Sequence, residues 1–367
     1  MSLEYDSPEK LYDAFLDGIL TDRSSRNSVL RVFSNCLGDD GEVLDEMCVA
    51  VRGHDLSRED FGKTHQGLVL RDIVDKLFGK VVVKKVEAVS EGEFGYGIDD
   101  CGKSRLRRDY DVARSLFYRS GQDLLFETGS CDCLPIARVV EPLFCEEGIY
   151  VQRRMAGVPL LKYEDRGEEF ALRLVYSVVL LHSGLKEIRS GVVDYKKEFN
   201  HISGLLGVDL KFPFDFVPNG VVHNSLHPGN VLIDLPDLTF LDFELVAKGM
   251  KQDDFIRLFN GPIRFDVDND FLLKCYYLFN LNPRRFSGGQ ENIAGLRNNV
   301  LKYVGRLDGS DKFQKFMFDY HMRRVPLHMW AHHHLTGKGV PNTQLDEVVD
   351  ATFQAEQYCG WWDRRKV

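Results

Sequence analysis

The chain has 367 residues, of which 44% are hydrophobic and 28% are charged, and its formal net charge is −9. This composition is ordinary for a globular protein, and the length favours about two domains. The negative charge argues against a protein that binds nucleic acid or an anionic membrane through bulk electrostatics. No stretch approaches the ~18 consecutive apolar residues of a spanning helix, so we expect no membrane span.

The N-terminus and the cysteines indicate a cytoplasmic protein. The first residues, MSLEYDSPEKLYDAF, are acidic and lack the basic and then apolar organisation of a signal peptide. The eight cysteines are scattered, apart from Cys131 and Cys133, and no C-x2-C pair is present. We therefore expect reduced thiols and no zinc site of common spacing.

The N-terminal part is predicted to be helical and then to form a strand. Residues 1–65 favour helices and turns without recognisable chemistry. Residues 79–89, GKVVVKKVEAV, alternate as a half-exposed strand in which Lys84 points to the buried side and Lys85 to the outward side. The alternative is an edge strand with two ordinary solvated lysines. Residues 92–102 are predicted to form a long flexible loop.

A helix is predicted over residues 104–118, with Ser104 as its N-cap. Its acidic residues include Asp109 and Asp111. A buried stripe is predicted at Leu106, Tyr110, Ala113, Leu116 and Phe117.

Apolar strands and a second helix follow. One strand is predicted near residues 134–140 and another within GIYVQRRMAGVPL, residues 148–160. Residues 166–184 are predicted to form a helix that ends in His182-Ser183-Gly184 and has Leu172, Val175, Val179 and Leu180 inward. The stretch between Gly184 and Val221 separates this helix from the next motif and is called the insertion below.

The most informative stretch is Val221–Glu244, VVHNSLHPGNVLIDLPDLTFLDFE. Two short apolar runs flank a Leu-Pro-Asp turn, which predicts a β-hairpin. A polar cluster precedes the hairpin and an acidic tip follows it, so Asn230 and Asp242 leave neighbouring strands at the same end. Amide and carboxylate oxygens are suited to a divalent cation.

This stretch resembles the catalytic loop and metal-binding motif of the protein-kinase-like superfamily. HNSLHPGN is similar to H-x-D-x-(K/H)-P-x-N, and LDFE is similar to the Asp-Phe-Gly motif in a variant form. The closest resemblance is to aminoglycoside phosphotransferases, choline kinases and lipopolysaccharide-core kinases. It implies that His223 is structural, that His227 faces the transferred phosphate, and that Asn230 and Asp242 bind Mg²⁺.

The resemblance extends upstream and covers roughly residues 80–260. It implies that Lys84, or alternatively Lys85, contacts the ATP phosphates. Asp109 would pair with that lysine, with Asp111 as the alternative, and the shorter Asp side chain implies a longer or water-mediated ion pair. Residues 152–154, from Gln152 to Arg154, would form the hinge that meets adenine. No glycine loop of the expected G-x-G-x-x-G form precedes the lysine strand. The alternative to the long loop at residues 92–102 is that VKKVEAVSEGEFGYG, residues 83–97, is the first strand and glycine loop of a protein kinase.

One position departs from the family pattern, because Ser225 stands where the catalytic Asp is expected. A serine hydroxyl cannot act as a general base near neutral pH, although it can align an acceptor. Several explanations stay open: a pseudokinase, a kinase that recruits another base such as His227 or Glu244, or an engineered replacement. Nucleotidyl transfer and a module that binds no nucleotide are further alternatives.

The sequence therefore predicts an α+β, two-lobed protein-kinase-like fold. The expected domains are a helical extension (1–65), a small β-rich lobe (66–157) and a larger helical lobe (158–367). The expected function is a phosphotransferase that uses ATP and Mg²⁺ and acts on a small-molecule or sugar hydroxyl, because no A-P-E motif follows Asp242. The alternative is a nucleotide-binding pseudokinase. The oligomeric state is not predicted.

Overall fold

The structure is a computed structural model of the chain. Two predicted segments, the N-terminal extension 1–65 and the loop 92–102, lie outside the residues that it describes. The described residues are 81–85, 105–120, 136–146, 149–198, 200, 216–235, 237–259, 263–282 and 293–337.

The chain divides into two compact units. The first unit comprises Met1–Glu93, Lys103–Arg114 and Val140–Met155. The second comprises Phe94–Gly102, Ser115–Val139 and Ala156–Val367. Each unit is described by itself below.

The first unit contains a three-stranded antiparallel sheet in the order β1-β4-β3. Its strands are β1 (Val81–Lys85), β3 (Pro142–Glu146) and β4 (Ile149–Arg153). The register pairs Lys84 with Tyr150. Helix α5 (Arg105–Ser120) begins in this unit and ends in the second. The predicted apolar stripe of α5 is confirmed, since Tyr110, Ala113 and Leu116 are buried.

The second unit contains the predicted hairpin, formed by β7 (Val231–Asp234) and β8 (Asp237–Phe240). This hairpin is the centre of a four-stranded sheet in the order β2-β8-β7-β5, with β2 (Ile136–Val139) parallel to β8. Strands β6 and β9 form a separate antiparallel pair. The polar loop, residues 223–230, begins directly after β6. The remaining short elements are β5 (Val158–Pro159), β6 (Gly220–Val222), β9 (Ala247–Gly249), η1 (Leu160–Lys162), η2 (Pro228–Asn230) and η3 (Phe243–Leu245).

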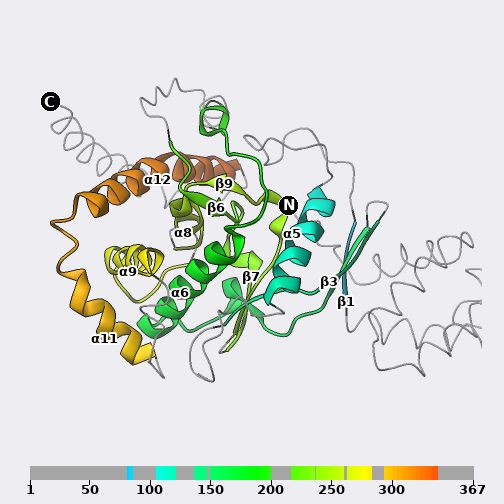
Figure 1. Cartoon of the computed structure of the whole chain (residues 1–367), viewed down its shortest axis with the longest axis horizontal. Helices are drawn as coiled ribbons and strands as arrows, with labels where there is room; N and C mark the ends of the chain where they lie inside the picture. The colour runs from blue at the N-terminus through cyan, green and yellow to red at the C-terminus, as the bar shows by residue number, and fades with distance from the viewer. Residues whose placement is uncertain are drawn as a thin grey trace, which may run out of the picture. The chain divides into compact units, whose positions relative to one another are not determined.

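Helices supply most of the second unit's core (Figure 1). Helix α6 packs against α8 and α9, α12 packs against α8, and α11 packs against α6 and α9. The predicted inward residues of α6, Leu172, Val175, Val179 and Leu180, are all buried, and so are nine others of its 18 residues. Its apolar character on nearly all sides suits a central helix surrounded by neighbours. The helices are α6 (Glu168–Leu185), α8 (Lys251–Phe259), α9 (Asn269–Leu281), α11 (Ile293–Val304) and α12 (Asp311–Gly337).

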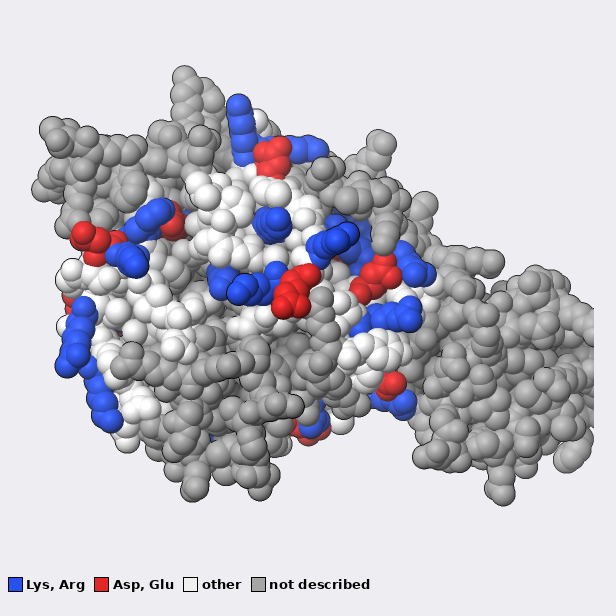
Figure 2. Space-filling model, viewed as in Figure 1, with Lys and Arg blue, Asp and Glu red and all other residues white. Residues whose placement is uncertain are grey.

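The described elements confirm the predicted α+β class, with a small sheet region and a larger helical part. On the face in Figure 2, basic and acidic side chains are interspersed. Some of the ion pairs join residues one helical turn apart, such as Lys315–Asp319 and Arg173–Glu169. Among the helices that the structure describes, none combines the length and apolar character that a membrane-spanning segment needs.

Candidate active site

The hairpin brings the polar loop and the acidic tip together at one end. The Leu241 backbone N–H donates to the Asn230 carbonyl at 3.0 Å, which continues the β7–β8 pairing to the mouth of the hairpin. Asn224 and Asp242 both adopt left-handed backbone conformations, with φ of 65° and 70°. Asn and Asp tolerate this region better than other side chains that carry a Cβ. The loop and the strand end therefore both turn sharply beside the same hairpin.

Asn230 is oriented to offer an oxygen. Its Nδ2 donates to the Ser225 carbonyl at 3.0 Å. Within the described residues its Oδ1 has no hydrogen-bond donor. Asp242, two residues beyond the strand that pairs with β7, precedes η3 as its N-cap. No group of three or more His, Cys, Asp or Glu side chains suited to a metal occurs among the residues described. An Asn–Asp pair alone suits Mg²⁺ whose other ligands are phosphates and water.

Ser225 occupies the predicted base position and is half-buried. Its Oγ lies 3.2 Å from His223 Nδ1 and 3.3 Å from the Asp242 carbonyl oxygen. Both of these atoms can accept a hydrogen bond from the hydroxyl. The Ser225 carbonyl accepts from the His227 backbone N–H at 2.9 Å and from Asn230. The serine is thus fixed by its backbone as well as by its side chain.

His227 is arranged as a donor. Its Nδ1 accepts the Gly229 backbone N–H at 3.0 Å, so the neutral ring carries its proton on Nε2. Burial lowers the pKa of His227, and the nearby Asp242 carboxylate offsets part of that shift. A neutral imidazole with Nδ1 occupied and Nε2 protonated can donate to an oxygen but cannot take a proton. This geometry disfavours His227 as the substitute general base.

Gly229 is required by its closeness to the His227 ring. A Cβ at position 229 would lie 2.9 Å from His227 Cε1 and 3.0 Å from Nδ1. A substitution there would push the imidazole out of its place. The loop sequence H-P-G is therefore explained by packing as well as by the turn.

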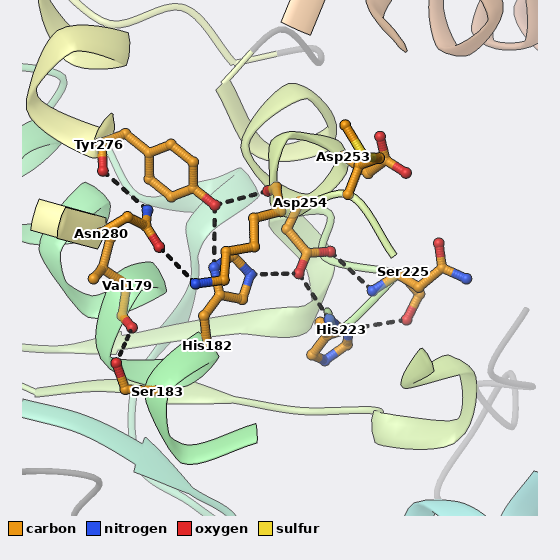
Figure 3. A network of polar contacts seen from close by, with 12 residues as sticks. Val179, His182, Ser183, His223, Ser225, Asp253, Asp254, Tyr276 and Asn280 are labelled. Carbon is orange, nitrogen blue, oxygen red and sulfur yellow. Dashed lines mark hydrogen bonds and ion pairs between the residues drawn. The ribbon is translucent and has the colours of Figure 1, made fainter. Parts of the chain in front are cut away.

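Asp254 anchors the polar loop, and sequence reasoning missed it. Its buried carboxylate accepts the backbone N–H groups of His223 and Asn224 at 2.7 and 2.8 Å, and His182 Nε2 lies 2.8 Å from it (Figure 3). These interactions lower the pKa of Asp254, although burial opposes them. Burial lowers the pKa of His182, whose Nδ1 lies 3.1 Å from the Tyr276 hydroxyl. Asp254 is therefore a positioning residue for the loop.

The neighbouring carboxylate has a different role. Arg323 Nε and Nη2 donate to the two oxygens of Asp253 at 2.7 and 3.0 Å, and Nη2 also donates to Glu198 at 2.9 Å. The guanidinium lies over the Tyr195 ring at 4.2 Å. This buried cluster ties the insertion before the hairpin to α8 and α12. The only sequence signal for it was the adjacent pair Asp253-Asp254, whose acidic side chains are both fully buried.

The first unit contains the predicted lysine–acid pair. Lys84 Nζ lies 2.6 Å from Asp109 Oδ2, and the Asp109 side chain is 1% exposed. The expectation of a longer or water-mediated pair is wrong, because the Lys84 side chain makes the contact directly. Asp111, the alternative acid, instead pairs with Arg107 at 3.1 Å. The Lys84 ammonium also lies 5.5 Å from the centre of the Tyr150 ring.

The predicted hinge residues have unlike environments. Gln152 in β4 is buried, and within the described residues its Oε1 has no hydrogen-bond partner. Arg154 is exposed, whereas Arg153 forms an ion pair with Glu141. A buried amide oxygen without a donor is costly, and a ligand donor would remove that cost. The adenine role of Gln152 and Arg154 stays a prediction.

The structure thus gathers Ser225, His227, Asn230 and Asp242 within the second unit. Lys84, Asp109, Gln152 and Arg154 belong to the first unit. The phosphate, metal and catalytic roles of all eight residues remain predictions, which the geometry of each unit accommodates.

No protein-family model matches the sequence, and no curated protein matches it. Similar solved structures include an ADP-bound aminoglycoside phosphotransferase, APH(2'')-Ib, with 14% identity, a TM-score of 0.34, and coverage of 76% of this chain and 88% of that one. The Plasmodium vivax ethanolamine kinase has 11% identity and a TM-score of 0.35, over 83% and 91% of the two chains. Amicoumacin kinase hAmiN, in complex with AMP-PNP, Ca²⁺ and Ami, has 13% identity and a TM-score of 0.36, over 76% and 81%.

Their names describe one phosphotransferase and two kinases. At TM-scores of 0.34 to 0.36 the likeness assigns neither a ligand nor a reaction to this chain.

Proposed function

We propose that the protein binds ATP with Mg²⁺ and is a kinase-like phosphotransferase whose acceptor is a small-molecule or sugar hydroxyl. The observation that carries this proposal is the mouth of the hairpin. There the Asn230 amide is oriented by its bond to the Ser225 carbonyl, and its Oδ1 accepts no hydrogen bond from the described residues. Asp242 follows the neighbouring strand β8, whose continuation at Leu241 bonds the Asn230 carbonyl. Within the part of the chain that the structure describes, no cluster of three or more His, Cys, Asp or Glu side chains joins this oxygen pair, as expected where nucleotide phosphates complete the metal's coordination.

Two further features support the proposal. Burial favours the neutral form of His227, and Gly229 donates to its Nδ1. The Nε2–H group is then left to donate, which suits contact with a phosphate oxygen. Lys84 is fixed by a buried carboxylate, as a phosphate-positioning lysine requires. A bound Mg²⁺ would be held by Asn230 and Asp242 and would neutralise charge on the transferred phosphoryl group.

A pseudokinase is the second candidate, and one observation favours it. The side chain at the base position is Ser225, and its hydroxyl contacts His223 and the Asp242 backbone. Loss of a general base typically slows a reaction by about 10²- to 10⁴-fold. Nucleotide and metal would bind under both candidates, so turnover of an added acceptor distinguishes them.

The proposal is tested by thermal unfolding with Mg·ATP, with ATP alone, and with the Asp242→Asn variant. Asn is preferred to Ala because position 242 has a left-handed backbone. The matched control is Asp234→Asn, an exposed position at the far end of β7. Saturation at 100 times the Kd stabilises by about 2.7 kcal/mol. A shift that needs Mg²⁺, survives in Asp234→Asn and disappears in Asp242→Asn supports the site; no shift at millimolar nucleotide refutes it.

A further inference from the structure

The hydroxyl at the base position lies within hydrogen-bond reach of a base, as in an activated nucleophile, and also of the Asp242 carbonyl oxygen. His223 Nε2 lies 2.8 Å from the Leu241 carbonyl oxygen, which can only accept, so Nε2 carries the ring proton. In the neutral ring Nδ1 is then a bare acceptor, and it lies 3.2 Å from Ser225 Oγ. A nucleophile, a base within reach and a third group that orients the base form the arrangement that activates serine in other enzymes.

The arrangement is held rigidly by the loop's backbone. The N–H groups of His223 and Asn224 are bonded to the buried Asp254 carboxylate. The Ser225 carbonyl accepts from both the Asn230 amide and the His227 N–H. The nucleophile–base distance is therefore fixed by the same bonds that orient the candidate metal ligand Asn230.

The surroundings can also accommodate the proton that the base would take up. His223 is fully buried and packs against the Phe243 ring at 5.0 Å. Its backbone N–H donates to the buried Asp254 carboxylate at 2.7 Å. The Leu241 carbonyl would continue to accept Nε2–H in both protonation states.

We infer that Ser225 is itself a phosphoryl acceptor, so that the protein forms a phosphoserine from its bound nucleotide. This inference rests on the proposed function, because it requires ATP at the Asn230–Asp242 site. The bond between Ser225 Oγ and the γ-phosphorus forms as the bond from that phosphorus to the β–γ bridging oxygen breaks. The hydroxyl proton passes to His223 Nδ1, and ADP leaves with the bonding electron pair. The residue that replaces the expected base thereby stands at the acceptor position.

The test uses the full chain, Mg²⁺ and ATP radiolabelled on the γ-phosphate, with acid quenching and peptide mapping by mass spectrometry. We expect the label on the peptide that contains Ser225, and its complete loss in Ser225→Ala. The matched control is Ser183→Ala, since Ser183 on α6 donates its hydroxyl to the Val179 carbonyl, outside the site. The control should label as the wild type does.

The base is tested separately with His223→Gln, whose amide nitrogen can keep the bond to Leu241 while Nδ1 is removed. Labelling should slow by about 10²-fold or more. The unfolding midpoint of each variant shows whether it is folded. If His223→Gln does not fold, the test rests on Ser225→Ala alone.

The outcomes separate this inference from the proposed function. A Mg²⁺-dependent thermal shift with nucleotide but no label would overturn the phosphoserine and leave the nucleotide site standing. Label that persists in Ser225→Ala would also overturn it. The absence of both shift and label would overturn the two proposals together.

Discussion

Replacing Asp254 with Asn should destabilise the protein strongly although it changes only one atom. The carboxylate is fully buried; its Oδ1 accepts the Asn224 N–H, and its Oδ2 contacts both the His223 N–H and His182 Nε2 (Figure 3). An amide has one oxygen, so its NH₂ group must face at least one of these donors. The variant therefore loses an acceptor where three donors converge.

The size of the effect follows from the hydrogen bonds. One backbone donor left buried without an acceptor costs about 1–3 kcal/mol. The remaining bonds lose the carboxylate charge, and charge-assisted bonds are roughly twice as strong as neutral ones. We expect the free energy of unfolding to fall by about 3–4 kcal/mol, and the polar loop to lose its fixed geometry.

The assay is urea unfolding at neutral pH, extrapolated linearly to water. The matched control is Asp270→Asn, which makes the same change of net charge at a side chain that is 48% exposed and pairs with Lys274 at 3.0 Å. That exposed pair should contribute less than about 1 kcal/mol. If Asp254→Asn is as stable as the control, the carboxylate does not hold the loop and the reasoning is wrong.

Three further predictions concern other ion pairs and one titrating group. Arg323→Lys should lower the free energy of unfolding by about 3 kcal/mol in urea, because Lys cannot bond both oxygens of buried Asp253; a loss below 1 kcal/mol would contradict this. A double-mutant cycle of Lys84→Met and Asp109→Asn should give a coupling of about 1–3 kcal/mol, and additive losses would exclude an effective ion pair. Burial and Arg324 lower the pKa of His321 to about 4 from 6.5, so between these values the unfolded state binds more protons and stability falls as the pH falls. From pH 7 to pH 5 the loss should be about 2 kcal/mol greater in the wild type than in His321→Phe, measured by urea unfolding at both pH values.

Local patterns in the sequence were enough to predict the hairpin and helix α5. The two apolar runs within Val231–Asp234 and Asp237–Phe240 and the turn between them are a short-range signal, and so is the apolar stripe of α5. Pairing of Lys84 with Asp109 could be predicted because a family pattern links the two segments. The same pattern drew attention to Ser225, which stands where that pattern has Asp.

The supporting residues could not be predicted because their partners are distant in the chain. Asp254 contacts His223 from 31 residues away, and Arg323 contacts Asp253 from 70 residues away. No periodicity or motif joins such positions. The inward residues predicted for helix α6 are buried, but they are only part of its buried surface, because a helix enclosed by several neighbours is apolar nearly all round.

The most direct test of the account is a titration of ATP into the wild-type protein by calorimetry, with Mg²⁺ and with a chelator, repeated on Asp242→Asn. The account predicts saturable binding that requires Mg²⁺ and is lost or strongly weakened in the variant. ATP binding of equal affinity under all three conditions, or no binding to the wild type, would contradict a nucleotide–metal site at the mouth of the β7–β8 hairpin.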